Sequence, residues 1–131
     1  MAYGATDADG KVFMLDLNSF SKIYLHKGIT DMRKQINGLA AFVQNEMRLD
    51  PFGRYLFIFC GRRRRSIKIL YWDRTGYCLW QKLLEKEKFF WPKERDQNQI
   101  ELSVEQLRWL LDGYDVWRMK PHETLNYKYV S

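Results

Sequence analysis

The sequence predicts an α+β fold, in which an antiparallel sheet of four to five strands carries one amphipathic helix and is followed by a second, C-terminal helix. Between residues 54 and 84, apolar segments of strand length alternate with turn residues. Between residues 31 and 48, apolar residues instead recur every three or four positions. A chain of 131 residues suits one such domain. We expect it over residues 21–115, between a flexible segment at 1–20 and a tail at 116–131.

The strands of the predicted sheet are short and end at turn residues. Residues 22–26 form the first, and residues 55–60 form a continuous apolar strand. The alternation over residues 66–72 makes the five residues before it the loop of a hairpin. A second turn, with Gly76 in the left-handed conformation, leads into a strand over residues 77–84. Residues 89–91 complete the sheet.

Two helices are predicted from their apolar faces and their end signals. In the first, over residues 31–48, Thr30 or Asp31 caps the N-terminus, and Asp50-Pro51 lies beyond the end. The apolar face of this helix consists of Met32, Ile36, Leu39, Ala40, Val43 and Met47. The second helix, over residues 103–112, starts with Ser103 and Gln106 at the spacing of a capping box, and Gly113 ends it.

The composition indicates a soluble cytoplasmic protein. Of the chain, 46% is hydrophobic and 16% aromatic, which suits a packed core. No apolar run approaches the ~20 residues that span a membrane, and the N-terminus lacks the pattern of a signal peptide. Cys60 and Cys78 lie in apolar segments, which favours buried thiols over a disulfide. Whether translation begins at Met1 or Met14 stays open.

The positive charge is concentrated in the middle of the chain. The net charge is +6, but residues 60–95 alone carry eleven basic and four acidic residues. Four consecutive arginines at a hairpin tip present planar donors that suit phosphate oxygens. The predicted nucleic-acid site is therefore Arg62, Arg63, Arg64, Arg65, Lys68, Arg74 and Lys82. The alternative is a solvated turn that keeps the protein in solution.

Aromatic residues are interleaved with this basic region. On an exposed sheet face, such side chains stack on unpaired bases. Burial is the favoured interpretation, because the strands of a small sheet need large apolar side chains. Trp72, beside Asp73, and Trp91, beside Pro92, are expected to be the least buried.

Patterns of catalytic chemistry are weak or missing in the sequence. His26 and His122 are far apart, and neither Cys60 nor Cys78 has the CxxC spacing of a zinc site. No glycine-rich phosphate loop or nucleophile elbow occurs. The carboxylates that a two-metal nuclease would need have ordinary roles as helix caps or turn residues. We therefore expect no enzyme activity, no metal and no cofactor.

Three phrases in the sequence are more specific than these patterns. The first is Thr30-Asp31-Met32-Arg33-Lys34, the second is Asp50-Pro51-Phe52, and the third is Leu70-Tyr71-Trp72-Asp73-Arg74-Thr75-Gly76. Leu79-Trp80 and Phe90-Trp91-Pro92 follow the third phrase in order. Together they resemble TnpB, the Orf2-like accessory protein of sixty-six-type bacterial insertion sequences. The family's signature residues are then Asp31, Met32, Arg33, Lys34, Tyr71, Trp72 and Asp73, to which the resemblance assigns no role.

The resemblance implies a part in transposition beside a separate, larger transposase that carries the catalytic carboxylates. Combined with the basic hairpin, it predicts DNA binding and help for the transposase at the element ends, with DNA and transposase as the partners. A protein-interaction module that contacts the transposase without nucleic acid is the alternative. DNA against RNA, sequence specificity and oligomeric state stay open at this point.

Overall fold

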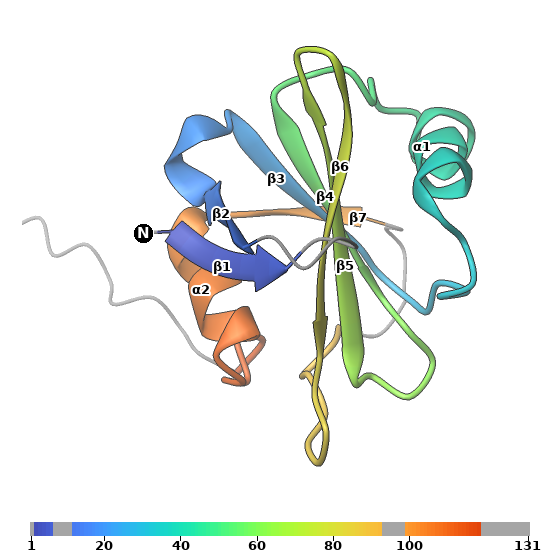
Figure 1. Cartoon of the computed structure of the whole chain (residues 1–131). Coiled ribbons are helices and arrows are strands. Elements are labelled where there is room, and N and C mark those ends of the chain that lie inside the picture. Colours follow the sequence, from blue (N-terminus) through green and yellow to red (C-terminus); the bar gives the residue numbers. More distant parts are fainter. Residues whose placement is uncertain (1, 7–11, 93–98, 119–131) are drawn as a thin grey trace, which may run out of the picture.

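The structure, a computed structural model, describes residues 2–6, 12–92 and 99–118. Its centre is a five-stranded sheet with the strand order β6-β5-β4-β3-β7. The strands are β3 (Lys22–His26), β4 (Tyr55–Cys60), β5 (Ser66–Asp73), β6 (Gly76–Leu83) and β7 (Gln99–Leu102). The helices α1 (Ile36–Asn45) and α2 (Val104–Leu111) lie on opposite sides of the sheet (Figure 1). The predicted α+β class is confirmed.

One strand pair differs from the predicted antiparallel arrangement. β4–β5, β5–β6 and β3–β7 are antiparallel, but β3 and β4 are parallel, with Lys22 opposite Tyr55. The connection between β3 and β4 contains α1, which crosses one face of the sheet. A crossover of this kind returns the chain to the same end of the sheet, so the two strands must run in parallel.

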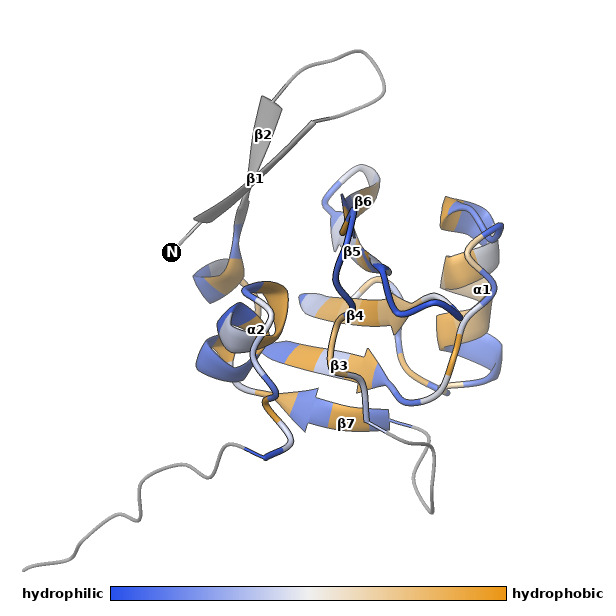
Figure 2. Cartoon of the chain, turned by 90° about the horizontal axis from the view of Figure 1, so that it is seen from below, coloured by the Kyte–Doolittle hydropathy of each residue, from blue (hydrophilic) through white to orange (hydrophobic). Residues whose placement is uncertain are grey.

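Each face of the sheet supports its own core. On one face, α1 contributes Leu39, Val43 and neighbours to a cluster with Phe57, Phe59 and Leu70. On the other, α2 packs with Ile23, Leu25, Leu56, Ile58, Ile67 and Ile69. Polar and apolar residues alternate along β3 and β7 (Figure 2), whereas the last five residues of β4 are all buried. β4 therefore lies at the centre of both cores, which explains its continuous apolar sequence.

The segment that follows β6 was predicted as a strand over residues 89–91, and this prediction is wrong. Phe89 and Trp91 are buried in the α2-side core without forming a strand. The Trp91 indole donates hydrogen bonds from Nε1 to the carbonyl oxygens of His26 (3.1 Å) and Gly28 (3.0 Å). Trp91 is therefore a buried anchor rather than an exposed ring, and β7 supplies the fifth strand instead. Trp72 is half-buried, as predicted.

The start of α1 also differs from the prediction. The helix is preceded by Gln35 rather than capped by Thr30 or Asp31. Asp31 instead organises a turn, in which its carbonyl oxygen accepts a hydrogen bond from the Lys34 N–H (3.0 Å). α2 agrees with its prediction, because Ser103 and Gln106 form a reciprocal capping box and Gly113 has a φ of 93°.

The β5–β6 turn places its left-handed residue two positions earlier than expected. Arg74, with a φ of 43°, occupies that conformation, and Gly76 does not. The strands run up to the turn on both sides, since Asp73 pairs with Gly76. Only Arg74 and Thr75 remain to reverse the chain, which requires the left-handed backbone between the strands.

The chain ends contain structure that the sequence patterns did not assign. β1 (Ala2–Thr6) and β2 (Val12–Asp16) form an antiparallel pair, followed by a 3-10 turn, η1 (Leu17–Ser19), whose Leu17 is buried in the α2-side core. At the other end, Val116 is buried and the Trp117 Nε1 donates to the Phe90 carbonyl (2.7 Å). Packing therefore extends past residue 115, while flexibility of residues 1–20 and a tail from 116 stay predictions.

Burial of the Cys60 thiol predicts a loss of stability at alkaline pH. Burial raises the pKa of this thiol from 9.0 to about 12. The unfolded chain ionises first, so the stabilisation is complete below pH 9 and is lost as the pH rises through 12. At pH 10.5, the free energy of unfolding measured with urea should be roughly 2 kcal/mol lower than below pH 9, because the loss is about 1.4 kcal/mol per pH unit.

Cys60→Ala should lose that much less stability between pH 8 and pH 10.5 than the wild-type chain. Cys78→Ala is the comparison variant: burial also raises the pKa of the Cys78 thiol, but this thiol is only partly buried, so the change in the alkaline loss should be smaller. An unchanged alkaline loss in Cys60→Ala would contradict this assignment.

Candidate nucleic-acid interface

The arginine loop, residues 61–65, joins β4 to β5 in a compact turn. The Gly61 N–H donates to the Ser66 carbonyl (3.1 Å), and the Arg64 N–H donates to the Gly61 carbonyl (2.9 Å). Arg64 has a φ of 57°, which turns the chain back toward β5. Arg62, Arg63 and Arg64 are exposed. Within residues 12–92 and 99–118, no carboxylate lies at ion-pair distance from these three guanidiniums.

The base of the loop is fixed to the segment after β6. Arg65 is half-buried, and its Nε donates to the Leu84 carbonyl (3.1 Å). The Leu84 N–H donates to the Arg65 carbonyl (2.7 Å), and the Phe89 N–H donates to the Arg64 carbonyl (2.6 Å). The loop is therefore a supported surface element, and its outer guanidiniums are presented from a fixed backbone.

Two open hollows border this loop. The smaller, about 520 Å³, is lined by Arg62, Arg63, Arg65 and Lys88. We call it the cationic hollow. The larger, about 1100 Å³, shares the same three arginines and extends between the loop, residues 29–33 and the end of β6. We call it the groove. Its remaining lining is Ile29, Thr30, Asp31, Met32, Arg33, Gly61, Ser66, Leu83, Leu84 and Glu85.

One wall of the groove is the Asp31 turn, residues 30–34. The Asp31 carboxylate accepts from the Arg33 N–H (2.9 Å), from Arg33 Nε (3.0 and 3.1 Å) and from Nη2 (2.8 Å). We call these hydrogen bonds the Asp31 fork. They orient the Arg33 guanidinium, although the Arg33 side chain is 91% exposed. The same hydrogen bonds lower the pKa of Asp31 from 3.8 to about 2. Arg33 is thus held by its neighbour before any ligand arrives.

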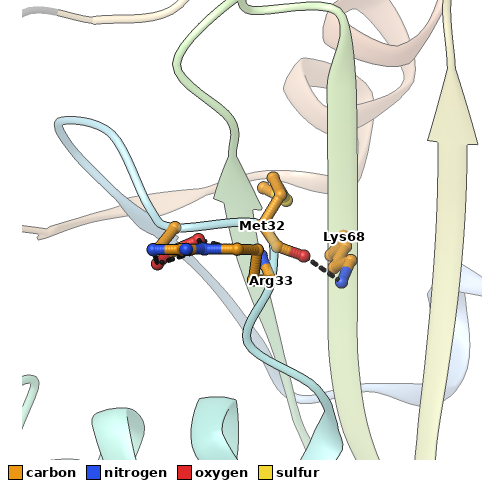
Figure 3. A network of polar contacts seen from close by, with 4 residues as sticks. Met32, Arg33 and Lys68 are labelled. Carbon is orange, nitrogen blue, oxygen red and sulfur yellow. Dashed lines mark hydrogen bonds and ion pairs between the residues drawn. The ribbon is translucent and has the colours of Figure 1, made fainter.

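Three hydrogen bonds attach the Asp31 turn to the sheet, and one packing contact attaches it to the arginine loop. The Lys68 ammonium donates to the carbonyl oxygens of Met32 (2.8 Å) and Lys34 (3.0 Å), and Figure 3 shows Lys68 directed at the Met32 carbonyl. The Thr30 N–H donates to the Cys60 carbonyl (2.9 Å). Met32 packs so closely on Gly61 that a Cβ there would lie 2.7 Å from its Cγ. The turn and the arginine loop are therefore fixed relative to each other.

The ionisation of Asp31 offers a direct check on this fork. NMR titration of its carboxyl carbon should give a midpoint near pH 2. Because the folded pKa is lowered, the fork is complete above pH 3.8 and is lost as the pH falls through 2. In Arg33→Gln, which removes the largest cause of the shift, the midpoint should return toward the ordinary value. A midpoint that stays near 2 in this variant would contradict the fork.

The two other signature phrases meet at the opposite end of the sheet. Phe52 packs edge-on against Trp72 at 5.0 Å between ring centroids, and stacks with Tyr77 at 5.7 Å. Asp50 forms the turn before it, accepting from the Phe52 N–H at 2.9 Å. We call Phe52, Trp72 and Tyr77 the aromatic cluster. Phe52 is 55% exposed, so this cluster is open to solvent.

The match to known proteins covers all of these features. Residues 21–121 match the family described as IS66 Orf2 like protein. The chain belongs to this family. It is 37% identical to the uncharacterized protein y4hO of Sinorhizobium fredii over 85% of this chain and 94% of that one. It is also 34% identical to y4jC of the same organism, over 69% of this chain and 76% of that one. No solved structure matches significantly.

Membership of the IS66 Orf2-like family confirms the resemblance and associates the chain with transposition in an accessory role. Other site chemistry is limited in the part of the chain that the structure describes. That part contains no cluster of three or more metal-ligating His, Cys, Asp or Glu residues. It also contains no helix of the length and hydropathy needed to cross a membrane.

In this IS66 Orf2-like chain, three residues of the predicted site, Lys68, Lys82 and Arg74, do not line the hollows beside the arginine loop. Lys68 is buried, and its ammonium is used by the Asp31 turn. Lys82 donates to the Leu111 carbonyl at the end of α2 (2.8 Å). Arg74 is at the far end of β5, roughly 25 Å from the loop at about 3.3 Å per strand residue. The candidate interface therefore centres on Arg62, Arg63 and Arg65, and nucleic-acid contact by these side chains stays a prediction.

The remaining signature residues have structural contacts. Lys34 lies over the Phe42 ring, with its Nζ 5.7 Å from the centroid. Tyr71 packs edge-on against Phe20 at 5.3 Å, and Asp73 is 3.8 Å from the exposed Arg74. Of the seven signature residues, only Asp31, Met32 and Arg33 line the groove.

Sequence reasoning missed the groove itself. Ile29 and Leu83 line it and are 50% and 67% exposed. Lys88 belongs to the segment of residues 60–95 in which basic residues are in excess, and it completes the cationic hollow. Ile29 falls between the predicted strand over residues 22–26 and the predicted helix over residues 31–48. An apolar residue in such a connection is a signal that was available.

Proposed function

We propose that this protein is a transposition accessory protein of the cytoplasm that binds DNA through its arginine loop and assists a separate transposase. The exposure of Arg62 and Arg63 beside Arg65 and Lys88, around the cationic hollow, carries this proposal. Among the residues that the structure describes, the hollow is lined only by cations. Such a lining suits a phosphate backbone, whose oxygens accept from guanidinium and ammonium groups. The excess of basic residues over residues 60–95 adds long-range attraction to the same region.

The proposed mechanism is positioning rather than bond breaking. Phosphate contacts fix where a protein lies on DNA but carry no sequence information by themselves. The accessory protein would hold DNA near the transposase, which supplies the chemistry. No residue of this chain is assigned a catalytic role.

An electrophoretic mobility-shift series with the wild-type protein tests DNA binding. At ~50 mM salt, where electrostatic binding is strong, we expect retention of DNA from the element ends and of random DNA of equal length. Retention should fall steeply by ~200 mM salt. Failure to retain either DNA at the lower salt would contradict the proposal.

The aromatic cluster supports a second candidate, a module that contacts the transposase without nucleic acid. Phe52 is a large exposed apolar side chain beside two half-buried rings, and exposed aromatic residues are enriched at interaction sites. Co-purification with the transposase that is lost in Phe52→Ser, together with no DNA retention, would favour this candidate.

A further inference from the structure

We propose that the groove binds an unpaired nucleotide of the DNA, with phosphates on the arginine loop and the base against the apolar wall. This inference rests on the proposed function, because it names the form of DNA that the same site prefers. Phosphate contact alone needs no apolar surface. The apolar part of the groove is therefore complementary to a ligand with an exposed apolar face.

The apolar wall is formed by side chains that the protein itself leaves partly or largely exposed. Leu83 at the end of β6 and Ile29 near the start of the β3–α1 connection remain half or more exposed. Met32 and Leu84 complete the wall. In a paired duplex the flat faces of the bases are stacked inside, so they cannot contact a concave surface of this kind. An unpaired base exposes both faces and can enter it.

The groove is continuous with the cationic hollow. Arg62, Arg63 and Arg65 line both, so a strand whose phosphates lie in the hollow continues directly into the groove. The groove, about 1100 Å³, is slightly larger than the ~300–1,000 Å³ of sites that enclose small molecules. A base with its sugar therefore fits within it.

Arg33 adds a preorganised platform at the groove wall. Its guanidinium is held by hydrogen bonds to Asp31, and the Arg33 side chain is 91% exposed. Bases in single strands stack on guanidinium planes as well as on aromatic rings. Because the hydrogen bonds of Asp31 and Lys68 fix the turn, little conformational entropy is lost when a base binds.

An acidic peptide is the competing ligand, and the carboxylates of the groove disfavour it. Glu85 and Asp31 both line the groove. They would repel the side chains of an acidic segment, whereas the amino groups of bases can donate to a carboxylate. The cationic hollow next to the groove also matches consecutive phosphates along one chain.

Fluorescence anisotropy with three DNA probes tests the inference. The probes are a blunt duplex, the same duplex with a short single-stranded overhang, and the single strand. We expect the wild-type protein to bind the overhang probe about tenfold more tightly than the blunt one, in line with the size of base-stacking contributions. The double variant Ile29→Ser, Leu83→Ser should lose this preference and bind the blunt duplex as before.

Both substituted residues are exposed, so the double variant keeps its fold. Tyr114→Ser, at a 56% exposed aromatic residue outside the groove, is the matched control and should keep the preference. Equal binding of blunt and overhang probes by the wild-type protein, or an unchanged preference in the double variant, overturns the inference and leaves DNA binding intact. Absence of binding to all three probes overturns the proposed function as well. Loss of transposase binding in the double variant, with the DNA preference kept, would assign the groove to a protein segment instead.

Discussion

Replacement of Lys68 by alanine should lower the free energy of unfolding by about 2–4 kcal/mol, through a cavity and two carbonyls that lose their donor. Lys68 is 3% exposed, and its ammonium bonds to the Met32 and Lys34 carbonyls. Burial lowers the pKa of this amine, and the charge of Asp31 partly opposes that effect. The amine is thus kept inside by its hydrogen bonds, and chemical denaturation measures what they contribute.

Two further variants separate the hydrogen bonds of Lys68 from its packing. Lys68→Met retains most of the stem and should recover part of the loss, leaving the cost of the two unpaired carbonyls. Lys22→Ala is the control, because Lys22 is exposed and its Nζ is 4.0 Å from Glu101. A pair of that kind contributes about 0–1 kcal/mol. If Lys68→Ala cost no more than Lys22→Ala, the attachment of the Asp31 turn would be wrong.

Replacement of Arg62, Arg63 and Arg65 by glutamine should weaken DNA binding about 100-fold or more at ~100 mM salt, by removing up to three phosphate contacts. Glutamine keeps part of the side-chain stem and removes the charge and the guanidinium donors. The fold should tolerate the change at Arg62 and Arg63, which are exposed. At Arg65 the bond to the Leu84 carbonyl is at risk, so unfolding midpoints accompany the binding measurement.

A charge-matched triple variant controls for the loss of net charge. Lys22, Arg48 and Arg118 are exposed and lie outside the loop, the groove and the cationic hollow. Their replacement by glutamine lowers the net charge equally and should weaken binding far less. Equal weakening in both triple variants would show that the total charge, not the arginine loop, binds DNA.

The local parts of the fold were predictable from the sequence. The hairpin of β4 and β5, the β5–β6 hairpin and the capping box of α2 depend on residues close together in the chain. The parallel pairing of β3 and β4 was not predicted, because a short apolar strand does not encode its direction. The burial of Trp91 depends on two carbonyls more than 60 residues away, which no local pattern records.

The same distinction applies to the site. The arginine loop was predicted because it is one uninterrupted phrase. The role of Lys68 was missed because its acceptors are 34 and 36 residues away in the sequence. Alternation along β5 put Lys68 on a sheet face, but only the packed structure shows that this face is covered by the Asp31 turn. The groove likewise needs three segments that the fold brings together.

The salt dependence of DNA affinity tests whether the arginine loop binds DNA phosphates. For the wild-type protein and the Arg62, Arg63, Arg65 glutamine variant, the logarithm of the binding constant is measured against the logarithm of salt concentration by anisotropy with one duplex. Each phosphate contact contributes about 0.9 to the slope. We expect a steep slope for the wild-type protein and one shallower by about 2–3 for the variant. Identical slopes for the two proteins would contradict it.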